Sequence, residues 1–158
     1  IQFHKLNNSK KISESEILYP KDLINYRKYQ IKASAQSLNY NSLIILQPKL
    51  GKTTILLLSI YNFQNPGKIV FISNDSESVR FLSSFFSVEP LNSSNTQENL
   101  ELWQKQHIIF ITIDILSSYI ENNQINLFNP KLIIFDDIDI ENLCEKEANI
   151  INNISNQD

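Results

Sequence analysis

Hydrophobic residues follow two alternating patterns along the chain. Short runs that are apolar at nearly every position, and rich in Ile, Val and Leu, have the pattern of strands covered on both faces. Longer stretches between these runs repeat apolar residues at helical spacing. We expect strands at residues 42–46, 68–72, 107–112 and 131–136, and helices at residues 26–38, 52–63, 76–86, 96–105 and 114–122. The alternation predicts an α/β fold with a mostly parallel sheet and helices on both faces, because parallel strands need such crossovers.

Polar segments flank the predicted domain. Residues 1–16 are rich in Asn, Ser and Lys without a clear period, so we expect a flexible N-terminal tail. Residues 17–145 fit one domain, and residues 146–158 form a polar C-terminal segment, either helical or frayed, that we expect to be truncated. Residues 87–95, with a proline and a run of Asn and Ser, predict a mobile loop. The chain begins with Ile1 rather than Met, so we expect it to be part of a longer product.

Composition narrows the class of protein. With 42% hydrophobic and 20% charged residues the chain has the composition of a soluble globular protein, and its net charge of −3 argues against a generally basic surface. Any contact with nucleic acid must then be local. The apolar runs are too short to cross a bilayer, so no membrane partner is expected. The single cysteine, Cys144, favours a reducing, intracellular compartment, and His4 and His107 are too far apart in sequence to suggest a transition-metal site.

A phosphate-binding motif follows the first predicted strand. Residues 47–54 read Gln-Pro-Lys-Leu-Gly-Lys-Thr-Thr, and an apolar helix follows. In this order the loop and the first helical turn aim backbone N–H groups at phosphate oxygens, Lys52 reaches the β- and γ-phosphates, and the Thr53 hydroxyl ligates Mg²⁺. The expected nucleotide-binding residues here are Gly51, Lys52, Thr53 and Thr54. Because Leu46 stands where the full motif has its first glycine, an ordinary helix start with a solvated lysine stays open as an alternative.

An acidic strand end supplies the second half of an ATPase site. Residues 132–139 read Leu-Ile-Ile-Phe-Asp-Asp-Ile-Asp, about 85 residues after the Gly-Lys-Thr motif. Ligands of α/β sheets bind at the carboxyl ends of strands, so Asp136 is expected to hold Mg²⁺ and Asp137 to orient or deprotonate the attacking water. The alternative is an acidic strand-to-helix turn in which Asp139 caps a short helix.

Several further segments carry a resemblance to a known family. They are residues 18–20 (Leu-Tyr-Pro), 27–30 (Arg-Lys-Tyr-Gln), 46–53, 61–71, 110–116 (Phe-Ile-Thr-Ile-Asp-Ile-Leu) and 136–139 (Asp-Asp-Ile-Asp). With them the chain resembles the FANCM/Hef-type helicases, the Fanconi anaemia group M branch of superfamily two. The resemblance implies a RecA-like P-loop NTPase lobe with ATP and Mg²⁺ as cofactors. It implies that Gln30 reads adenine, that Lys52, Asp136 and Asp137 are catalytic, and that Thr112 touches the DNA strand.

The chain departs from the family's pattern at several of these positions. Lys49 replaces the first glycine of the family's loop and Pro48 removes an N–H donor, which predicts weaker phosphate binding. Asp137 replaces Glu and is one methylene shorter, which predicts slow hydrolysis. Residues 74–79 carry two carboxylates where the family faces DNA, and Asp114 replaces a glutamine, so a poor grip on DNA or a helix cap without ligand is expected.

The resemblance implies an ATP-dependent DNA helicase or translocase acting in DNA repair or fork remodelling in the nucleus. Its partners would be DNA, held weakly by this lobe, and a second RecA-like lobe that supplies the arginine finger, so hydrolysis by this lobe alone is expected to be weak or absent. The alternative is a helicase-like scaffold that keeps the fold without turnover. A small P-loop kinase or GTPase is disfavoured because no Asn-Lys-x-Asp motif is present. Trp103 is expected in the core, whereas Tyr19 fits either adenine contact or surface packing.

Overall fold

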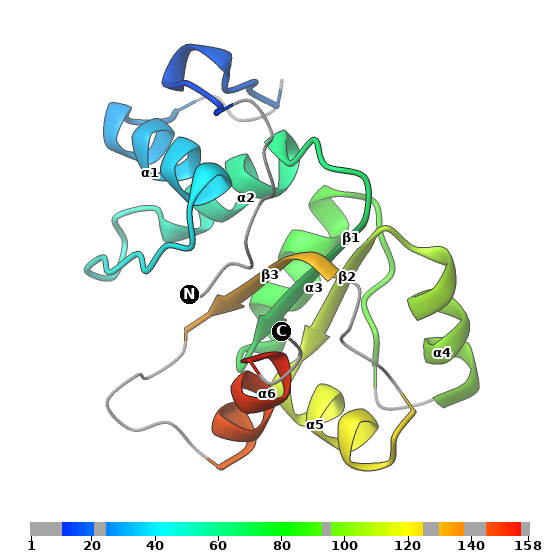
Figure 1. Ribbon diagram of the computed structural model, residues 1–158. Coiled ribbons are helices and arrows are strands. Elements are labelled where there is room, and N and C mark those ends of the chain that lie inside the picture. Colours follow the sequence, from blue (N-terminus) through cyan, green and yellow to red (C-terminus); the bar gives the residue numbers. More distant parts are fainter. Residues whose placement is uncertain (1–10, 21–24, 93–95, 125–129, 138–144, 156–158) are drawn as a thin grey trace. The chain divides into compact units, whose positions relative to one another are not determined.

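A computed structural model describes residues 11–20, 25–92, 96–124, 130–137 and 145–155 (Figure 1). Helices alternate with parallel strands along the chain, so it has the α/β class that the hydrophobic pattern predicts. The chain divides into two units, residues 1–66 and residues 67–158. None of the helices in the described ranges combines the length and the apolar run that crossing a lipid bilayer requires.

Two α-helices that pack on each other form the core of the first unit. Its elements are the short 3-10 helix η1 (Glu14–Glu16), α1 (Lys28–Asn39) and α2 (Lys52–Asn62). Leu38 and Leu58 are buried between the helices, and the hydroxyls of Ser37 and Ser59 form a buried hydrogen bond of 2.9 Å across the same interface. Small side chains allow the two helix backbones to approach closely. The helices predicted at residues 26–38 and 52–63 are therefore confirmed to within two residues at each end.

Residues 11–16 of the expected N-terminal tail lie against the end of α1. The Asn39 side chain accepts a hydrogen bond from the Ile12 N–H (2.8 Å) and donates one to the Ile12 carbonyl (2.7 Å). The Glu16 carboxylate in turn accepts a bond of 2.8 Å from the Ser13 N–H, which closes η1 as a capping box. Residues 1–10 lie outside the described part of the chain.

The prediction of a strand at residues 42–46 is wrong. This segment belongs to the first unit, has no regular secondary structure, and runs from the end of α1 to the loop before α2. Its Ile45 side chain is 80% exposed and its Leu43 side chain is 54% exposed. A strand exists only through hydrogen bonds to a neighbouring strand, and a buried one also needs both faces covered. The described residues provide neither for this segment, although its sequence has the apolar pattern of a strand.

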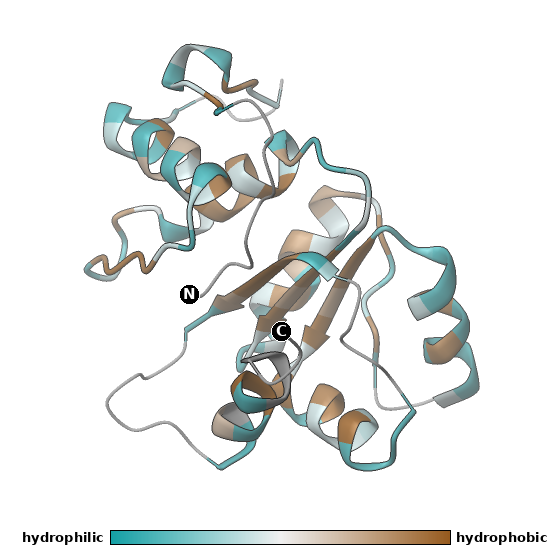
Figure 2. Ribbon diagram, in the orientation of Figure 1, coloured by the Kyte–Doolittle hydropathy of each residue, from teal (hydrophilic) through white to brown (hydrophobic). Residues whose placement is uncertain are grey.

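A three-stranded parallel sheet forms the centre of the second unit. Its strands are β1 (Lys68–Ser73), β2 (Ile108–Thr112) and β3 (Pro130–Asp136), in the spatial order β2-β1-β3. Helices α3 (Ser76–Phe85), α4 (Thr96–Lys105), α5 (Ile113–Glu121) and α6 (Glu145–Ser155) complete the unit. All three strands were predicted to within one residue at each end, and Figure 2 shows them brown, hence hydrophobic, along most of their length.

Helices cover both faces of this sheet, as predicted. On one face Val70 and Ile111 belong to a core that also contains Leu116 of α5 and Ile150 of α6. Side chains that alternate with these point to the other face, which α3 covers. There the ring of Phe110 lies 6.0 Å from that of Phe86, the residue that ends α3. Burial on both faces explains why nearly every position in these strands is apolar.

Candidate nucleotide-binding site

Helix α2 begins with the Gly-Lys-Thr motif, where the sequence predicts it. Gly51 is the N-cap and has a left-handed backbone (φ 77°, ψ 40°), and as a glycine it has no side chain with which to cap the first turn. The first helical bond runs from the Thr54 N–H to the Gly51 carbonyl (3.1 Å). Lys52 and Thr54 are half-buried in this turn, and Thr53 is exposed. Like other helix starts, this turn has backbone N–H groups and the positive end of the helix dipole, which are the features that anion sites use.

The loop before α2 contains a strained residue. Lys49 has a φ of 66°, in the left-handed region that glycine adopts most readily, and it lies inside a turn in which the Leu50 N–H donates to the Gln47 carbonyl. A residue with a Cβ loses about 1–2 kcal/mol in this conformation. The family that the chain resembles has a glycine at this position, and the positive φ of Lys49 agrees with that alignment.

Gln30 connects the start of α1 to this loop. Its side chain is only 4% exposed. The Gln30 side-chain oxygen accepts a hydrogen bond of 2.7 Å from the Arg27 N–H, and its amide donates toward the carbonyls of Gly51 (3.3 Å) and Leu50 (3.4 Å). The Tyr29 hydroxyl donates to the same Leu50 carbonyl. The group expected to read adenine is therefore bonded to the loop before α2, a link that the sequence did not predict.

The carboxyl edge of the sheet brings together two residues that come from separate motifs. Asp136 ends β3 and is 3% exposed, and Thr112 ends β2. Both are in register with Ser73 at the end of β1, so the three residues form one row with Ser73 in the middle. Neighbouring strands lie about 4.8 Å apart, which places the backbones of Asp136 and Thr112 about 10 Å from each other.

Ser73 is the member of this row that sequence reasoning missed. It lies one residue beyond the predicted strand, is buried, and accepts a hydrogen bond of 3.1 Å from the Asp75 N–H. A hydroxyl at the carboxyl end of a buried parallel strand is the signal that could have identified it.

Asp137 follows the row and has an unusual backbone. Its side chain is exposed and its φ is 55°. Asp and Asn enter the left-handed region more easily than other residues with a Cβ. The shorter acid at this position therefore suits the local backbone better than Glu would. Asp139, the alternative helix cap, lies outside the described residues, as does Cys144.

The acidic segment at residues 74–79 contains a helix cap. The Asp75 carboxylate accepts hydrogen bonds from the N–H groups of Glu77 (3.0 Å) and Ser78 (2.9 Å) at the start of α3. A further bond from the Ser78 hydroxyl (2.7 Å) is the largest of the effects that hold the pKa of Asp75 below its ordinary value. The structure thus shows that this segment caps α3, and a contact with DNA stays a prediction.

Other candidate residues have ordinary surroundings. Thr112 is the half-buried N-cap residue of α5 without a side-chain cap bond, and exposed Asp114 pairs with Lys146 at 2.6 Å. Tyr19 stacks on Tyr26 with ring centroids 4.1 Å apart. Trp103 is half-buried and packs against the core of the second unit, as expected. Within the described ranges, His, Cys, Asp and Glu side chains form no group of three or more that could hold a metal ion.

The two halves of the expected ATPase site belong to different units. Gln30 and the loop residues up to Thr54 are in the first unit, and Asp136, Asp137 and Thr112 are in the second. The structure therefore forms two separate groups of residues. Gln30, Gly51 and the start of α2 meet in the first unit, and Asp136, Ser73 and Thr112 form a row in the second.

Comparison with known proteins shows one distant similarity. Over 124 residues, or 70% of this chain, the sequence is 25% identical to the Fanconi anemia group M protein homolog of Mus musculus. The chain corresponds to only 6% of the length of that protein. No protein-family model matches the sequence, and no solved structure matches it. The similarity agrees with the resemblance found in the motifs and is too distant to establish membership of the family.

Proposed function

We propose that this chain is the ATP-binding lobe of an ATP-dependent DNA helicase or translocase of the FANCM/Hef type. The observation that carries the proposal is the start of α2, where left-handed Gly51 opens a helix with Lys52 and Thr53 in its first turn. The distant similarity to a Fanconi anemia group M protein homolog supports the choice of family. DNA repair or fork remodelling in the nucleus would be its setting.

Each expected site residue has a defined task in this proposal. Lys52 would offset the charge of the β- and γ-phosphates. Thr53, exposed in the first unit, and Asp136, buried in the second, each have an oxygen of the kind that Mg²⁺ prefers and would be its ligands. Bound Mg²⁺ would neutralise charge on the phosphate oxygens. Asp137 orients the attacking water, and a second RecA-like lobe adds the arginine that stabilises the transferring phosphoryl group.

Adenine recognition by Gln30 would be coupled to the phosphate loop. The Gln30 amide now bonds to the Leu50 and Gly51 carbonyls, and its oxygen bonds to the Arg27 N–H. An adenine that competes for the same carboxamide would loosen the contact between α1 and the loop. Binding of the base would then change the affinity of the loop for the phosphates, and the reverse, through this one side chain.

Titration calorimetry with Mg·ATP tests the nucleotide site. The parent chain is expected to bind and Lys52→Ala to lose binding, because the lysine charge on the phosphates is removed. Lys105→Ala is the matched control, since this lysine is 73% exposed at the end of α4 and should leave binding unchanged. Equal loss in both variants would show that the heat does not come from a site around Lys52.

A helicase-like scaffold without turnover is the second candidate. Lys49 at a φ of 66° and Asp137 in place of Glu both favour it, because each weakens a step that hydrolysis needs. The parent chain can be tested for binding of millimolar ATP, alone and joined to a second lobe. If the folded chain binds no ATP in either form, the scaffold is favoured over an ATP-dependent helicase.

A further inference from the structure

Charge is divided very unequally between the two units. Residues 1–66 contain nine Lys and Arg and three Asp and Glu, a net charge of +6. Residues 67–158 contain five and fourteen, a net charge of −9, so that the whole chain has −3. The modest total therefore conceals a basic first unit. Basic surfaces attract polyanions, and a charge asymmetry of this kind points to a partner for the first unit alone.

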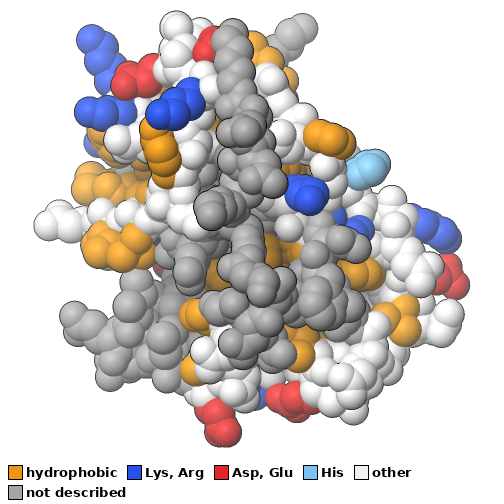
Figure 3. Space-filling view, viewed as in Figure 1, with side chains coloured by type: hydrophobic (Ala, Val, Ile, Leu, Met, Phe, Trp, Pro, Cys, Tyr) orange, Lys and Arg blue, Asp and Glu red, His pale blue; other side chains and the backbone are white. Residues whose placement is uncertain are grey.

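Three of these basic residues are at helix α1. Arg27, Lys28 and Lys32 are exposed at its start and in its first turns, and Lys28 and Lys32 are four residues apart, hence on one side of the helix. Among the described residues of the first unit, the acids are Glu14 and Glu16 of η1. Figure 3 shows Lys and Arg side chains next to hydrophobic ones over the part of the surface that α1 occupies.

The same unit also contains exposed tyrosines, and two of them neighbour these basic residues in the sequence. Five of the six tyrosines are in the first unit, and they are 37–54% exposed, namely Tyr19, Tyr26, Tyr29, Tyr40 and Tyr61. The rings of Tyr19 and Tyr26 stack face to face, 4.1 Å apart and within 4° of parallel. Tyr26 immediately precedes Arg27, and Tyr29 immediately follows Lys28. Stacked, exposed rings beside cations have the chemistry that single-stranded bases and phosphates recognise.

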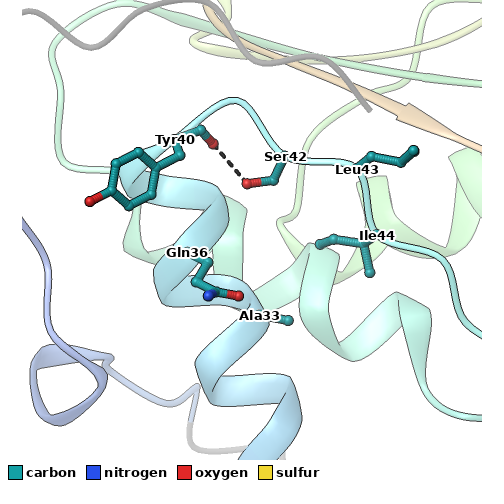
Figure 4. A pocket seen from close by; sticks show the side chains of 6 residues that line it. All are labelled: Ala33, Gln36, Tyr40, Ser42, Leu43 and Ile44. Carbon is teal, nitrogen blue, oxygen red and sulfur yellow. Dashed lines mark hydrogen bonds between the residues drawn. The ribbon is translucent and has the colours of Figure 1, made fainter.

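A pocket of about 310 Å³ adjoins the end of α1 (Figure 4). It is lined by Ala33, Gln36, Tyr40, Ser42, Leu43 and Ile44. Gln36 is one helical turn beyond Lys32, so the pocket continues the side of α1 that carries the lysines. The Tyr40 ring lies 5.2 Å from the Lys11 Nζ, and the Gln36 carboxamide offers both a donor and an acceptor to a base edge.

We propose that the Lys28–Lys32 side of α1, the neighbouring tyrosines and this pocket form a binding surface for single-stranded nucleic acid. The two lysines and Arg27 bind phosphates, and Tyr26 and Tyr29 stack on bases. The pocket at the end of α1 accepts one further base. An acidic polypeptide would use the same cations but would have no need of stacked rings, so the tyrosines decide in favour of nucleic acid. The surface needs neither ATP nor Thr112, and the proposal is independent of the ATPase function.

Fluorescence anisotropy of the whole chain with a labelled oligothymidine, without ATP, tests the proposal. The double variant Lys28→Glu/Lys32→Glu should weaken binding at least tenfold, because two phosphate contacts become repulsive. The slope of log affinity against log salt should also become shallower by about 1.4, at about 0.7 for each phosphate released from a single strand. The matched double variant Arg80→Glu/Lys105→Glu makes the same charge change on the exposed surface of the second unit and should change affinity less than twofold.

Tyrosine variants distinguish stacking from charge. Tyr26→Ala should weaken oligothymidine binding about tenfold, whereas Tyr26→Phe should keep the affinity of the parent, because phenylalanine retains the stacking face. Circular dichroism shows whether each variant keeps its helices. Three results would overturn the proposal: no binding by the folded parent at low salt, equal loss in the two charge-reversed double variants, or polyglutamate that competes as well as the oligonucleotide while Tyr26→Ala has no effect.

Discussion

The side-chain amide of Gln30 occupies the space that a Cβ at position 51 would need. An ideal Cβ built on Gly51 would come well within 3.0 Å of the Gln30 Nε2, closer than real Cβ atoms approach other atoms. The same amide donates toward the Gly51 carbonyl at 3.3 Å, and Gly51 has a φ of 77°. The backbone conformation therefore favours glycine at this position, and any larger residue would also have to push the end of the Gln30 side chain aside.

Gly51→Ala should destabilise the chain. The left-handed backbone costs a residue with a Cβ about 1–2 kcal/mol, and movement of the Gln30 amide away from the loop adds a smaller cost, so the free energy of unfolding should fall by about 1–3 kcal/mol. Urea denaturation followed by circular dichroism measures it. In a Gln30→Ala background only the backbone part remains, and Gly51→Ala should cost less. Identical costs in the two backgrounds would show that Gln30 does not restrict position 51.

Lys49→Gly should stabilise the loop before α2. The φ of 66° at Lys49 is costly for lysine and nearly free for glycine, so the free energy of unfolding should rise by about 0.5–1 kcal/mol after the greater unfolded-state freedom of glycine is subtracted. The same replacement at exposed Lys32, inside α1, should lower it by about 1 kcal/mol. Opposite signs in urea denaturation are the expected result, and a loss at both positions would contradict the left-handed conformation of Lys49.

Asp75 should make α3 sensitive to acid. Hydrogen bonds from Ser78 and Glu77 lower the pKa of its carboxyl from the ordinary value of 3.8 in the folded chain. Between that lowered pKa and 3.8 the unfolded chain binds more protons, so the stability from this cap is complete above pH 3.8 and is lost as the pH falls through the folded pKa.

Two replacements of Asp75 separate the cap from its charge. Asp75→Ala should lower Tm at neutral pH by roughly several degrees, and the difference from the parent should shrink as the pH falls below the folded pKa. Asp75→Asn keeps a good N-cap without a titrating group, so its Tm at neutral pH should lie between those of the parent and Asp75→Ala, and its difference from the parent should also shrink in acid. Thermal melts at a series of pH values measure both, and a constant deficit of Asp75→Ala down to strongly acidic pH would refute the charged cap.

Local sequence was sufficient for most elements and failed where the outcome depends on distant partners. The start of helix α2 could be predicted because Gly51 lies immediately before a run of apolar residues at helical spacing. Residues 42–46 have an equally clear apolar pattern, yet the pattern cannot say whether a neighbouring strand is present. The row of Asp136, Ser73 and Thr112 likewise depends on strand register, which joins residues more than 20 positions apart.

The charge of each unit and the partners of Gln30 could not be predicted from the sequence for a related reason. A net charge of −3 is a sum over the chain, so it could not reveal a basic unit of +6 beside an acidic one of −9. The positive φ at Lys49 could be anticipated, because the resembling family has glycine there. The partners of Gln30 could not, since they depend on the way α1 meets the loop before α2 in three dimensions.

Lys68 should be a stabilising residue of the second unit although it is a lysine at the start of a buried strand. Its Nζ donates to the carbonyls of Trp103 and Gln106 (2.6 Å to the latter) at the end of α4, and it lies 5.7 Å from the centre of the Trp103 ring. Lys68→Met leaves these carbonyls without their donor and should lower the free energy of unfolding by about 1–2 kcal/mol. The same change at exposed Lys105 should stay within about 0.5 kcal/mol.

The pH dependence of this effect has a definite sign. Burial lowers the pKa of Lys68 from its ordinary value of 10.5, so between the lowered pKa and 10.5 the unfolded chain binds more protons than the folded one. The stability advantage of the parent over Lys68→Met should therefore grow as the pH rises through the folded pKa toward 10.5. Urea denaturation of both proteins at a series of alkaline pH values measures the difference. An advantage that shrinks with rising pH would mean that the ammonium gains more from the two carbonyls and the Trp103 ring than it loses by burial.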